Sequence, residues 1–251
     1  GPGRQCRPAG DLAVTGPVLF ALAGLAAYAG NAAPAPLAAY GPGALLGVRK
    51  RLRHPGRVAL TFDDGPHPGA LPLFLRTLAD EDVRATFFLV GEQAAAYPAL
   101  VRELAAAGHE LANHGYRHRN HLLRSPLGIA GDIARGAGTI ERISGVRPAL
   151  YRPCYGVISA ATLLGARRAG TAVVLWSRWG RDWRRRATPG SIAREAAARP
   201  RGGDIVLLHD ADHYASPGSW RNTLAALPDI VGRIREARLE VGAIGGAGAL
   251  A

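Results

Sequence analysis

Apolar positions occur in short blocks along the chain from residue 57 onward, and the blocks are of two alternating kinds. Short apolar runs rich in Val, Leu, Ile and Phe predict buried strands, whereas apolar residues that recur every three or four positions predict helices. The predicted strands cover residues 58–62, 85–90, 110–113, 149–152, 171–176 and 205–209. The predicted helices cover residues 69–81, 98–107, 129–143, 160–169, 191–198, with Ser191 as N-cap, and 222–236.

The order of these blocks predicts the fold class. Strands that alternate with helices at this spacing indicate a mostly parallel sheet covered by helices. About seven such units favour an α/β fold of the distorted (β/α)7-barrel type over an open sheet. No internal repeat or low-complexity linker interrupts residues 57–251, so we predict a single catalytic domain there.

Residues 1–56 differ in composition from this domain and form a separate N-terminal segment. Residues 12–29 are apolar and small, a second stretch rich in Ala, Pro and Leu reaches residue 48, and a basic cluster follows at 49–53. A signal peptide or a single membrane anchor fits this pattern, although the apolar stretch is barely long enough for a span and Pro17 interrupts it. The other interpretation is an apolar helix that packs on the domain.

The chain is strongly basic, with a formal net charge of +12, and Lys50 is its only lysine. An excess of positive charge indicates an anionic partner. Because Ala and Gly are also abundant, a GC-rich coding bias is a second explanation for the arginine content. We expect an anionic cell-wall polymer rather than nucleic acid, membrane contact through residues 12–48, and an extracytoplasmic or membrane-associated location.

Chemically reactive side chains follow five of the predicted strands. In parallel α/β folds, the groups that carry out chemistry lie at the carboxyl ends of the strands. Here these are Asp63 and Asp64, His114 and His118, Arg152, Asp182 with Trp183, and His209 with Asp210. A single HxxxH is more often a surface or core feature than a ligand pair, but five such strand ends in register are hard to obtain from packing alone.

The paired aspartates and histidines fit a metal hydrolase. Histidines four residues apart on a helical turn face the same way, so His114 and His118 can reach one cation. One carboxylate completes a set with open positions for water, as catalytic zinc sites require. Neighbouring residues at a strand end point in different directions, so Asp63 and Asp64 can divide the roles of base and ligand. The cation offsets their paired charge and lowers the pKa of bound water toward ~7.

Five short segments resemble, in order, the five motifs of the polysaccharide deacetylases, the NodB-type domain of carbohydrate esterase family 4. They are TFDDG from Thr61, HGYRH from His114, RPCYG from Arg152, RDW from Arg181 and LLHD from Leu207. The resemblance covers about residues 57–242 and leaves the first 56 residues outside. It implies a metal-dependent N-deacetylase with one divalent ion, usually zinc and sometimes cobalt or another divalent metal.

The resemblance also implies a role for each motif residue on the metal side of the site. Asp64, His114 and His118 would bind the metal. Asp63 would be the general base, and Arg152 would keep it ionised and oriented, because an opposite charge lowers the pKa of a carboxylate.

The remaining motif residues would act on the acyl group and the leaving amine. The backbone N–H of Tyr155 would share the oxyanion with the metal. Asp182 would orient and tune His209, which would protonate the departing amine. Trp183 and Leu207 would wall a small apolar pocket for the acetyl methyl.

Three positions depart from the family pattern. Gly115 stands where the second motif usually has Ser or Thr, which removes a hydroxyl that braces the metal-site loop. Cys154 stands where the third motif usually has Pro, and Trp179 where the fourth motif often has its first Asp. None of the three is an assigned ligand, base or acid, but Cys154 and Trp179 would lie near the acyl or sugar site. The departures therefore leave the identity of the substrate open.

Three functions are consistent with these residues. The first is a metal-dependent N-deacetylase of N-acetylated amino sugars in a cell-wall glycan, a chitin-like oligosaccharide or a glycosylated small molecule. The second, favoured by the altered motifs, is a deacylase of a non-sugar N-acyl metabolite in natural-product biosynthesis. The third is an inactive basic module that binds a glycan or another polyanion, and the intact set of Asp and His residues argues against it.

Overall fold

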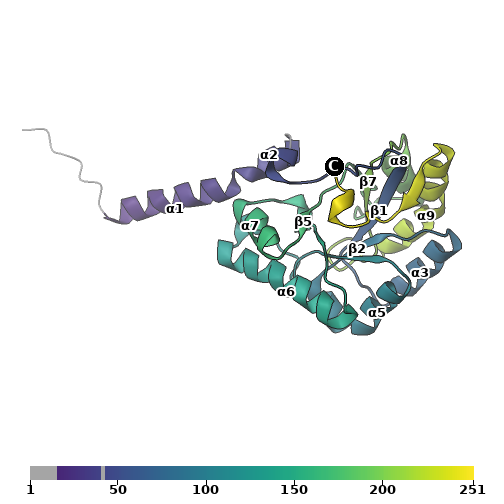
Figure 1. Ribbon diagram of the computed structural model, residues 1–251, viewed down its shortest axis with the longest axis horizontal. Coiled ribbons are helices and arrows are strands. Elements are labelled where there is room, and N and C mark those ends of the chain that lie inside the picture. The colour runs from purple at the N-terminus through teal and green to yellow at the C-terminus, as the bar shows by residue number, and fades with distance from the viewer. Residues whose placement is uncertain (1–15, 41–42) are drawn as a thin grey trace, which may run out of the picture.

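A computed structural model of the chain describes residues 16–40 and 43–251 (Figure 1). Parallel strands form one curled sheet in the order β5-β4-β3-β2-β1-β7-β6, and β8 pairs with the first half of β1. The strands are β1 (Arg57–Asp63), β2 (Thr86–Leu89), β3 (Glu110–Asn113), β4 (Leu150–Tyr151), β5 (Ala172–Val173), β6 (Arg178–Trp179), β7 (Ile205–His209) and β8 (Glu240–Gly242). The distorted (β/α)7 architecture predicted from the sequence is confirmed.

Helices surround the sheet and bury one of its faces (Figure 1). They are α3 (Leu71–Asp80), α4 (Gly91–Ala96), α5 (Pro98–Ala106), α6 (Pro126–Ser144), α7 (Ala160–Arg168), α8 (Pro189–Ala197) and α9 (Ser219–Glu236). The central core lies between this helical layer and the strands, where Phe62 stacks on Phe87 with ring centroids 5.0 Å apart and meets Phe74 edge-on at 5.3 Å. These apolar contacts fix β1 and β2 against the helical layer, and so fix the position of the reactive residues that follow β1.

The two-residue period of β1 decides which side chains enter the barrel interior. Val58, Leu60 and Phe62 belong to the core under the helices, whereas Ala59 packs in a second cluster on the opposite face. Thr61 and Asp63 share that opposite face, where both accept hydrogen bonds from the same guanidinium. The strand therefore directs the side chain of its last residue, Asp63, into the interior of the barrel.

Two local predictions differ from the structure. The predicted strand over residues 171–176 ends after Val173, and the chain then crosses to the other edge of the sheet, where β6 pairs with β7. Ser191 is not the N-cap of α8: Thr188 takes that position, and Ser191 stands at N3 of a reciprocal capping box, with Pro189 at N1. Helix α4 and strand β8 were not predicted, because both are short.

The N-terminal segment contributes two helices, α1 (Gly16–Ala32) and α2 (Pro34–Tyr40). Helix α1 extends away from the barrel (Figure 1), and the amide of Ala161 donates to Asn31 near its end. The apolar stretch predicted to begin at residue 12 lies partly outside the described residues. Within the described ranges, no helix has both the length and the apolar character needed to cross a bilayer.

Residues 49–52 of the same segment lie against the barrel. Arg49 bridges to Val174 in parallel, and Arg51 bridges to Asp204 in antiparallel orientation. The basic cluster therefore closes the gap between the two edges of the curled sheet, and the ordered unit begins before residue 57.

Candidate active site

The first aspartate of the pair forms a buried ion pair inside the barrel. Arg152 donates from Nη1 to Asp63 Oδ1 at 2.6 Å and to Thr61 Oγ1 at 2.9 Å, and both charged side chains are almost fully buried. Burial raises the pKa of Asp63, and the guanidinium of Arg152 opposes that rise. Burial thus outweighs the pairing that was expected to lower this pKa, and the carboxylate is a stronger base than a solvated aspartate.

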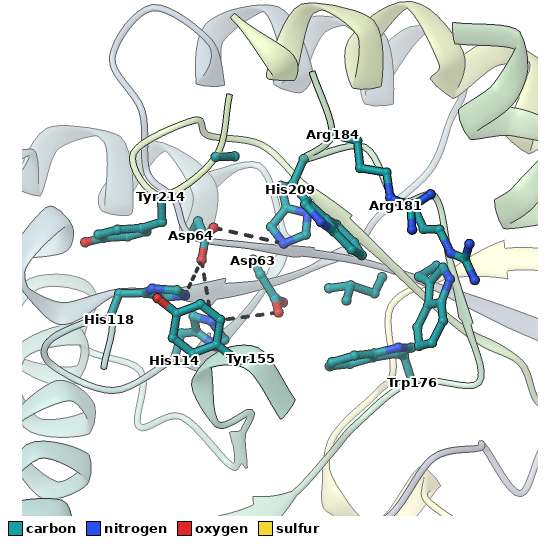
Figure 2. Close-up of a pocket in the computed structure, with 14 residues that line it drawn as sticks. Asp63, Asp64, His114, His118, Tyr155, Trp176, Arg181, Arg184, His209 and Tyr214 are labelled. Atoms are coloured by element: carbon teal, nitrogen blue, oxygen red, sulfur yellow. Dashed lines mark ion pairs between the residues drawn. The ribbon is translucent and has the colours of Figure 1, made fainter. Parts of the chain in front are cut away.

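The second aspartate points elsewhere because the backbone turns sharply after β1. Asp64 has a φ of 79°, in the left-handed region that few residues other than glycine adopt. Its Oδ1 lies 3.5 Å from His114 Nε2 and 3.3 Å from His118 Nε2 (Figure 2). One carboxylate oxygen and two imidazole nitrogens therefore face a common point.

The two histidines lie on a loop after β3, not on the helical turn that their spacing suggested. Gly115 between them has a φ of 89° and donates its amide to Asn113 Oδ1. Asp132 of α6 accepts hydrogen bonds from the amides of Tyr116 and Arg117. These contacts brace the loop without the hydroxyl that the family usually has at position 115.

The protonation states of the histidines suit metal binding. Burial lowers the pKa of His114 to about 3 and that of His118 to about 3, so both imidazoles are neutral at pH 7. His114 Nδ1 lies 2.8 Å from the carbonyl oxygen of Arg152 and donates its proton to it, so Nε2 is unprotonated and its lone pair is free to bind a metal.

The carboxylate of Asp64 is the third group that could bind a cation together with the two imidazoles. Burial raises its pKa to about 7, and its Oδ1 is buried without a hydrogen-bond partner among the described residues. A buried oxygen of this kind is costly unless something positive contacts it. Asp64, His114 and His118 therefore fit a single divalent cation.

Cys154 lies beneath the histidines and does not line the cavity where substrate contact was expected. Its side chain is 1% exposed, and its thiol donates to the carbonyl oxygen of His114 at 3.2 Å. Burial raises the pKa of the thiol well above its usual value. The sulfur is nevertheless close enough to His114 and His118 for the three to form a possible donor set, so the structure adds a candidate ligand that sequence reasoning had assigned to the substrate.

An imidazole from the fifth motif faces the metal ligands from the opposite side (Figure 2). His209 Nδ1 lies 2.9 Å from Asp182 Oδ1, while its Nε2 is 4.0 Å from Asp64 Oδ2. Asp182 also accepts from the amide of His209 and from the hydroxyl of Thr223, so its position is held from both sides. Burial alone would lower the pKa of His209, but Asp182 and the other nearby carboxylates raise it to about 10.

These groups open onto a cavity of about 420 Å³. The predicted substrate-binding residues Tyr155, Trp179, Trp183 and Leu207 line it. Tyr155 has a φ of 60°, and such strain in a non-glycine residue is often retained at functional sites. Its ring meets that of His118 edge-on, with centroids 4.6 Å apart.

Five further lining residues were not assigned to the site from the sequence, namely Trp176, Arg181, Arg184, Tyr214 and Ala215, of which Figure 2 labels the first four. Tyr214 stacks on His118 with ring centroids 4.1 Å apart and donates from its hydroxyl to Glu92. Tyr214 lies only four residues beyond the fifth motif, which is the one sequence signal that pointed to it.

The site can now be compared with known proteins. The family model described as polysaccharide deacetylase matches residues 50–174. A peptidoglycan-N-acetylglucosamine deacetylase of Bacillus cereus is 36% identical over 181 residues, which cover 71% of this chain and 82% of the relative. This chain belongs to the polysaccharide deacetylase family.

Two further relatives agree with this assignment. A chitooligosaccharide deacetylase of Bradyrhizobium sp. (strain ANU 289) is 38% identical over 156 residues, 61% of this chain and 70% of that protein. The crystal structure of the Bc1960 peptidoglycan N-acetylglucosamine deacetylase matches with a TM-score of 0.73 and 28% identity, covering 79% of this chain and 91% of that one. The resemblance inferred from the five motifs is thereby confirmed.

Proposed function

We propose that this polysaccharide deacetylase family member is a metal-dependent hydrolase that removes acetyl groups from N-acetylated amino sugars. One observation carries the proposal: a buried carboxylate paired with an arginine, a carboxylate with two imidazoles around one point, and an imidazole paired with an aspartate all face one cavity from different strand ends. Metal-assisted amide hydrolysis combines a base for the attacking water, a metal that activates it and an acid for the leaving amine, and these groups suit those roles. The similarity to deacetylases of peptidoglycan and of chitooligosaccharides supports the choice of an amino-sugar substrate.

We assign the metal to Asp64, His114 and His118, and we propose zinc, because two imidazoles and one carboxylate are typical ligands of catalytic zinc. Cobalt or another divalent ion is the alternative. When bound, such a cation acts as a Lewis acid that polarises the acyl oxygen and makes water a stronger nucleophile at neutral pH.

Asp63 accepts the proton of the attacking water in this scheme. Its Oδ2 lies 3.9 Å from His114 Nε2, which places the base next to the metal donors but outside the closest set. Arg152 fixes the other oxygen at 2.6 Å, so the free oxygen keeps one orientation toward the cavity. A pKa raised by burial makes the carboxylate a better proton acceptor.

His209 supplies the proton that the leaving amine needs. Because its pKa is raised to about 10, the imidazole carries that proton at neutral pH. Asp182 holds Nδ1, so Nε2 is the nitrogen that faces the cavity and delivers the proton. Leu207 and Trp183 form an apolar wall on this side, suited to the acetyl methyl, and the N–H of Tyr155 is assigned to the acyl oxygen.

Acetate release tests this proposal. The purified chain should release acetate from N-acetylglucosamine oligomers, lose that activity with a chelator and regain it on addition of zinc or cobalt. Release from non-sugar N-acyl amides, with none from amino sugars, would support the deacylase of a non-sugar metabolite instead. Glycan binding without release from any amide, in the metal-loaded protein, would support the inactive binding module.

A further inference from the structure

A second cavity, of about 890 Å³, opens beside the catalytic cavity. The two share His118, Tyr155 and Tyr214, so a chain-like substrate that passes these side chains enters the second cavity directly. Figure 2 shows the three shared side chains together on one side of Asp64, opposite Arg181 and Arg184.

Three arginines of one loop line this second cavity. Arg117, Arg119 and Arg124 lie in the segment that joins β3 to α6, which includes the second motif. Over residues 16–40 and 43–251, none of their guanidinium groups has a carboxylate within ion-pair distance, although eight other arginines do. The acid that lines the cavity, Glu92, accepts a hydrogen bond from Tyr214 instead.

Of the two arginines on the opposite side of the catalytic cavity, Arg184 is also without an ion pair among the described residues, but Arg181 is compensated. Arg181 pairs with Glu195 at 3.2 Å and lies over the ring of Trp179. Its charge is therefore already compensated by the protein. Three of the four arginines that line the two cavities without an ion pair therefore lie on the side of Tyr155 and Tyr214.

The nearest acid behind the loop, Asp132, interacts electrostatically with Arg117 and Arg124 but forms no ion pair with either, and a single carboxylate offsets only one of the three positive charges. Like charges around one hollow repel one another, so an anion between them is stabilised. Guanidinium favours carboxylate, which it can bind through two parallel hydrogen bonds. Because this cavity continues the catalytic one, the anion would be carried by the substrate itself.

We propose that the second cavity is a subsite for a carboxylate on the sugar next to the one that is deacetylated. This inference rests on the proposed function and narrows it to a glycan in which N-acetylmuramic acid with a free lactyl carboxylate accompanies N-acetylglucosamine, as in peptidoglycan strands without stem peptides, rather than a neutral chitin-like chain. Arg117, Arg119 and Arg124 are its specificity-determining residues.

Three substrates of matched length test the subsite. They are an N-acetylglucosamine tetramer, a tetrasaccharide that alternates N-acetylglucosamine with N-acetylmuramic acid, and the methyl ester of that tetrasaccharide. The ester keeps the shape and removes the charge. The wild-type chain should favour the free acid over its ester about 10- to 100-fold in kcat/KM, as expected for charge-assisted hydrogen bonds.

The triple variant Arg117→Gln, Arg119→Gln and Arg124→Gln should lose this preference and keep its activity on the neutral tetramer. The control variant Arg76→Gln, Arg102→Gln and Arg194→Gln changes the net charge equally at exposed helix positions and should keep the preference. A preference that survives in the first variant, or that is absent in the wild type, overturns the subsite.

Failure of the proposed function gives a different result. In that case the metal-loaded wild type releases no acetate from any of the three substrates. Calorimetric binding of the free acid and of its ester still tests the subsite, because it needs no turnover. Tighter binding of the acid by the wild type, but not by the cavity variant, supports the subsite, and equal binding overturns it.

A different observation concerns helix α1, in which residues 20–30 are all exposed and mostly apolar, on every side of the helix. Phe20 is 82% exposed and Leu25 is 64% exposed, and residues 16–48 contain no charged side chain. A helix that is apolar all round is stable where it is surrounded by apolar material, whereas pairing with a second copy needs only one apolar stripe. We infer that α1 contacts the acyl region of a phospholipid bilayer.

Vesicle sedimentation tests this contact with the full chain. The wild type should sediment with vesicles of phosphatidylcholine and phosphatidylglycerol, and Phe20→Asp with Leu25→Asp should abolish this. The control Leu127→Asp with Val146→Asp, at exposed positions of the barrel domain, should sediment like the wild type. A wild type that stays in the supernatant overturns the inference, as does self-association through α1 that occurs without vesicles.

Discussion

Replacement of Arg152 by methionine removes the buried positive charge on which the base depends. The guanidinium is fully buried, lies 3.9 Å from the ring centroid of Phe88 and donates to Asp63 at 2.6 Å. Methionine keeps an apolar contact with Phe88 but leaves Asp63 without a counter-charge. Thr61 loses a donor, yet its own hydroxyl still donates to the carbonyl oxygen of Val206 at 2.6 Å.

The expected loss follows from the burial of the pair. Removing one partner of a buried ion pair lowers the free energy of unfolding by about 3–5 kcal/mol, because an uncompensated charge remains. A domain of this kind typically has a free energy of unfolding of about 5–15 kcal/mol, so we expect the variant to fold at 25 °C.

The loss should depend on pH in a defined direction. Burial raises the pKa of Asp63, and without Arg152 it rises further above the value in the unfolded chain. A group with a raised folded pKa contributes stability at low pH that disappears as the pH rises through that pKa. The deficit of Arg152→Met relative to the wild type should therefore be larger at pH 7.5 than at pH 5.5.

Urea unfolding of the metal-free protein, followed by circular dichroism, measures both effects. Asp63→Asn alone leaves Arg152 unpaired and should also destabilise, whereas the double variant should lose at least about 2 kcal/mol less than the sum of the two single losses. Arg233→Met, which breaks an exposed pair with Asp229, serves as the control and should show no measurable change. Additive losses, or a deficit that does not vary with pH, would refute the assignment of a coupled buried pair.

Three further changes probe the separate roles at the site. Asp63→Asn should retain the metal, measured by elemental analysis, and lose about 10²- to 10⁴-fold in acetate release, because the base is gone; unchanged turnover contradicts its role. His118→Ala should weaken metal binding by more than ~100-fold in a chelator competition, since a direct ligand matters at least as much as its outer partners; full occupancy counts against the ligand set. Asp182→Asn should lower the pKa of His209 from about 10, measured by NMR titration of the metal-free protein. A pKa that stays near 10 shows that Asp182 is not its main support.

The sequence was sufficient to predict the strand ends that carry the chemistry. Apolar runs next to Asp63, His114 and His209 mark buried parallel strands, and the carboxyl ends of such strands meet at one edge. The distances among Asp64, His114 and His118 show that these three side chains are brought together. It was possible to predict that these residues, distant in the sequence, lie close together, because each follows directly after a strand of the sheet or lies within a few residues of one.

Features set by tertiary contacts were harder to predict. Strand β6 is two residues long and exists because it pairs with β7 at the far edge, so no local period marks it. His114 and His118 have helical spacing, yet they lie on a loop. The conformation of this loop is set by Asn113 of β3 and Asp132 of α6, whose side chains accept hydrogen bonds from its backbone amides. The direction of the pKa shift of Asp63 depends on burial in the folded barrel, which competes with the charge of Arg152.

The division of labour between the adjacent aspartates follows from the backbone around them. Asp63 is the last residue of β1 and continues its alternation, so its carboxylate enters the barrel beside Arg152. Asp64 leaves the strand with a φ of 79°, which directs its carboxylate to the histidines. Gly65 then passes so close to the Asp210 carboxylate that a β-carbon at this position would collide with it. The order of strand end, left-handed turn and glycine therefore lets the like charges of two adjacent residues serve two different partners.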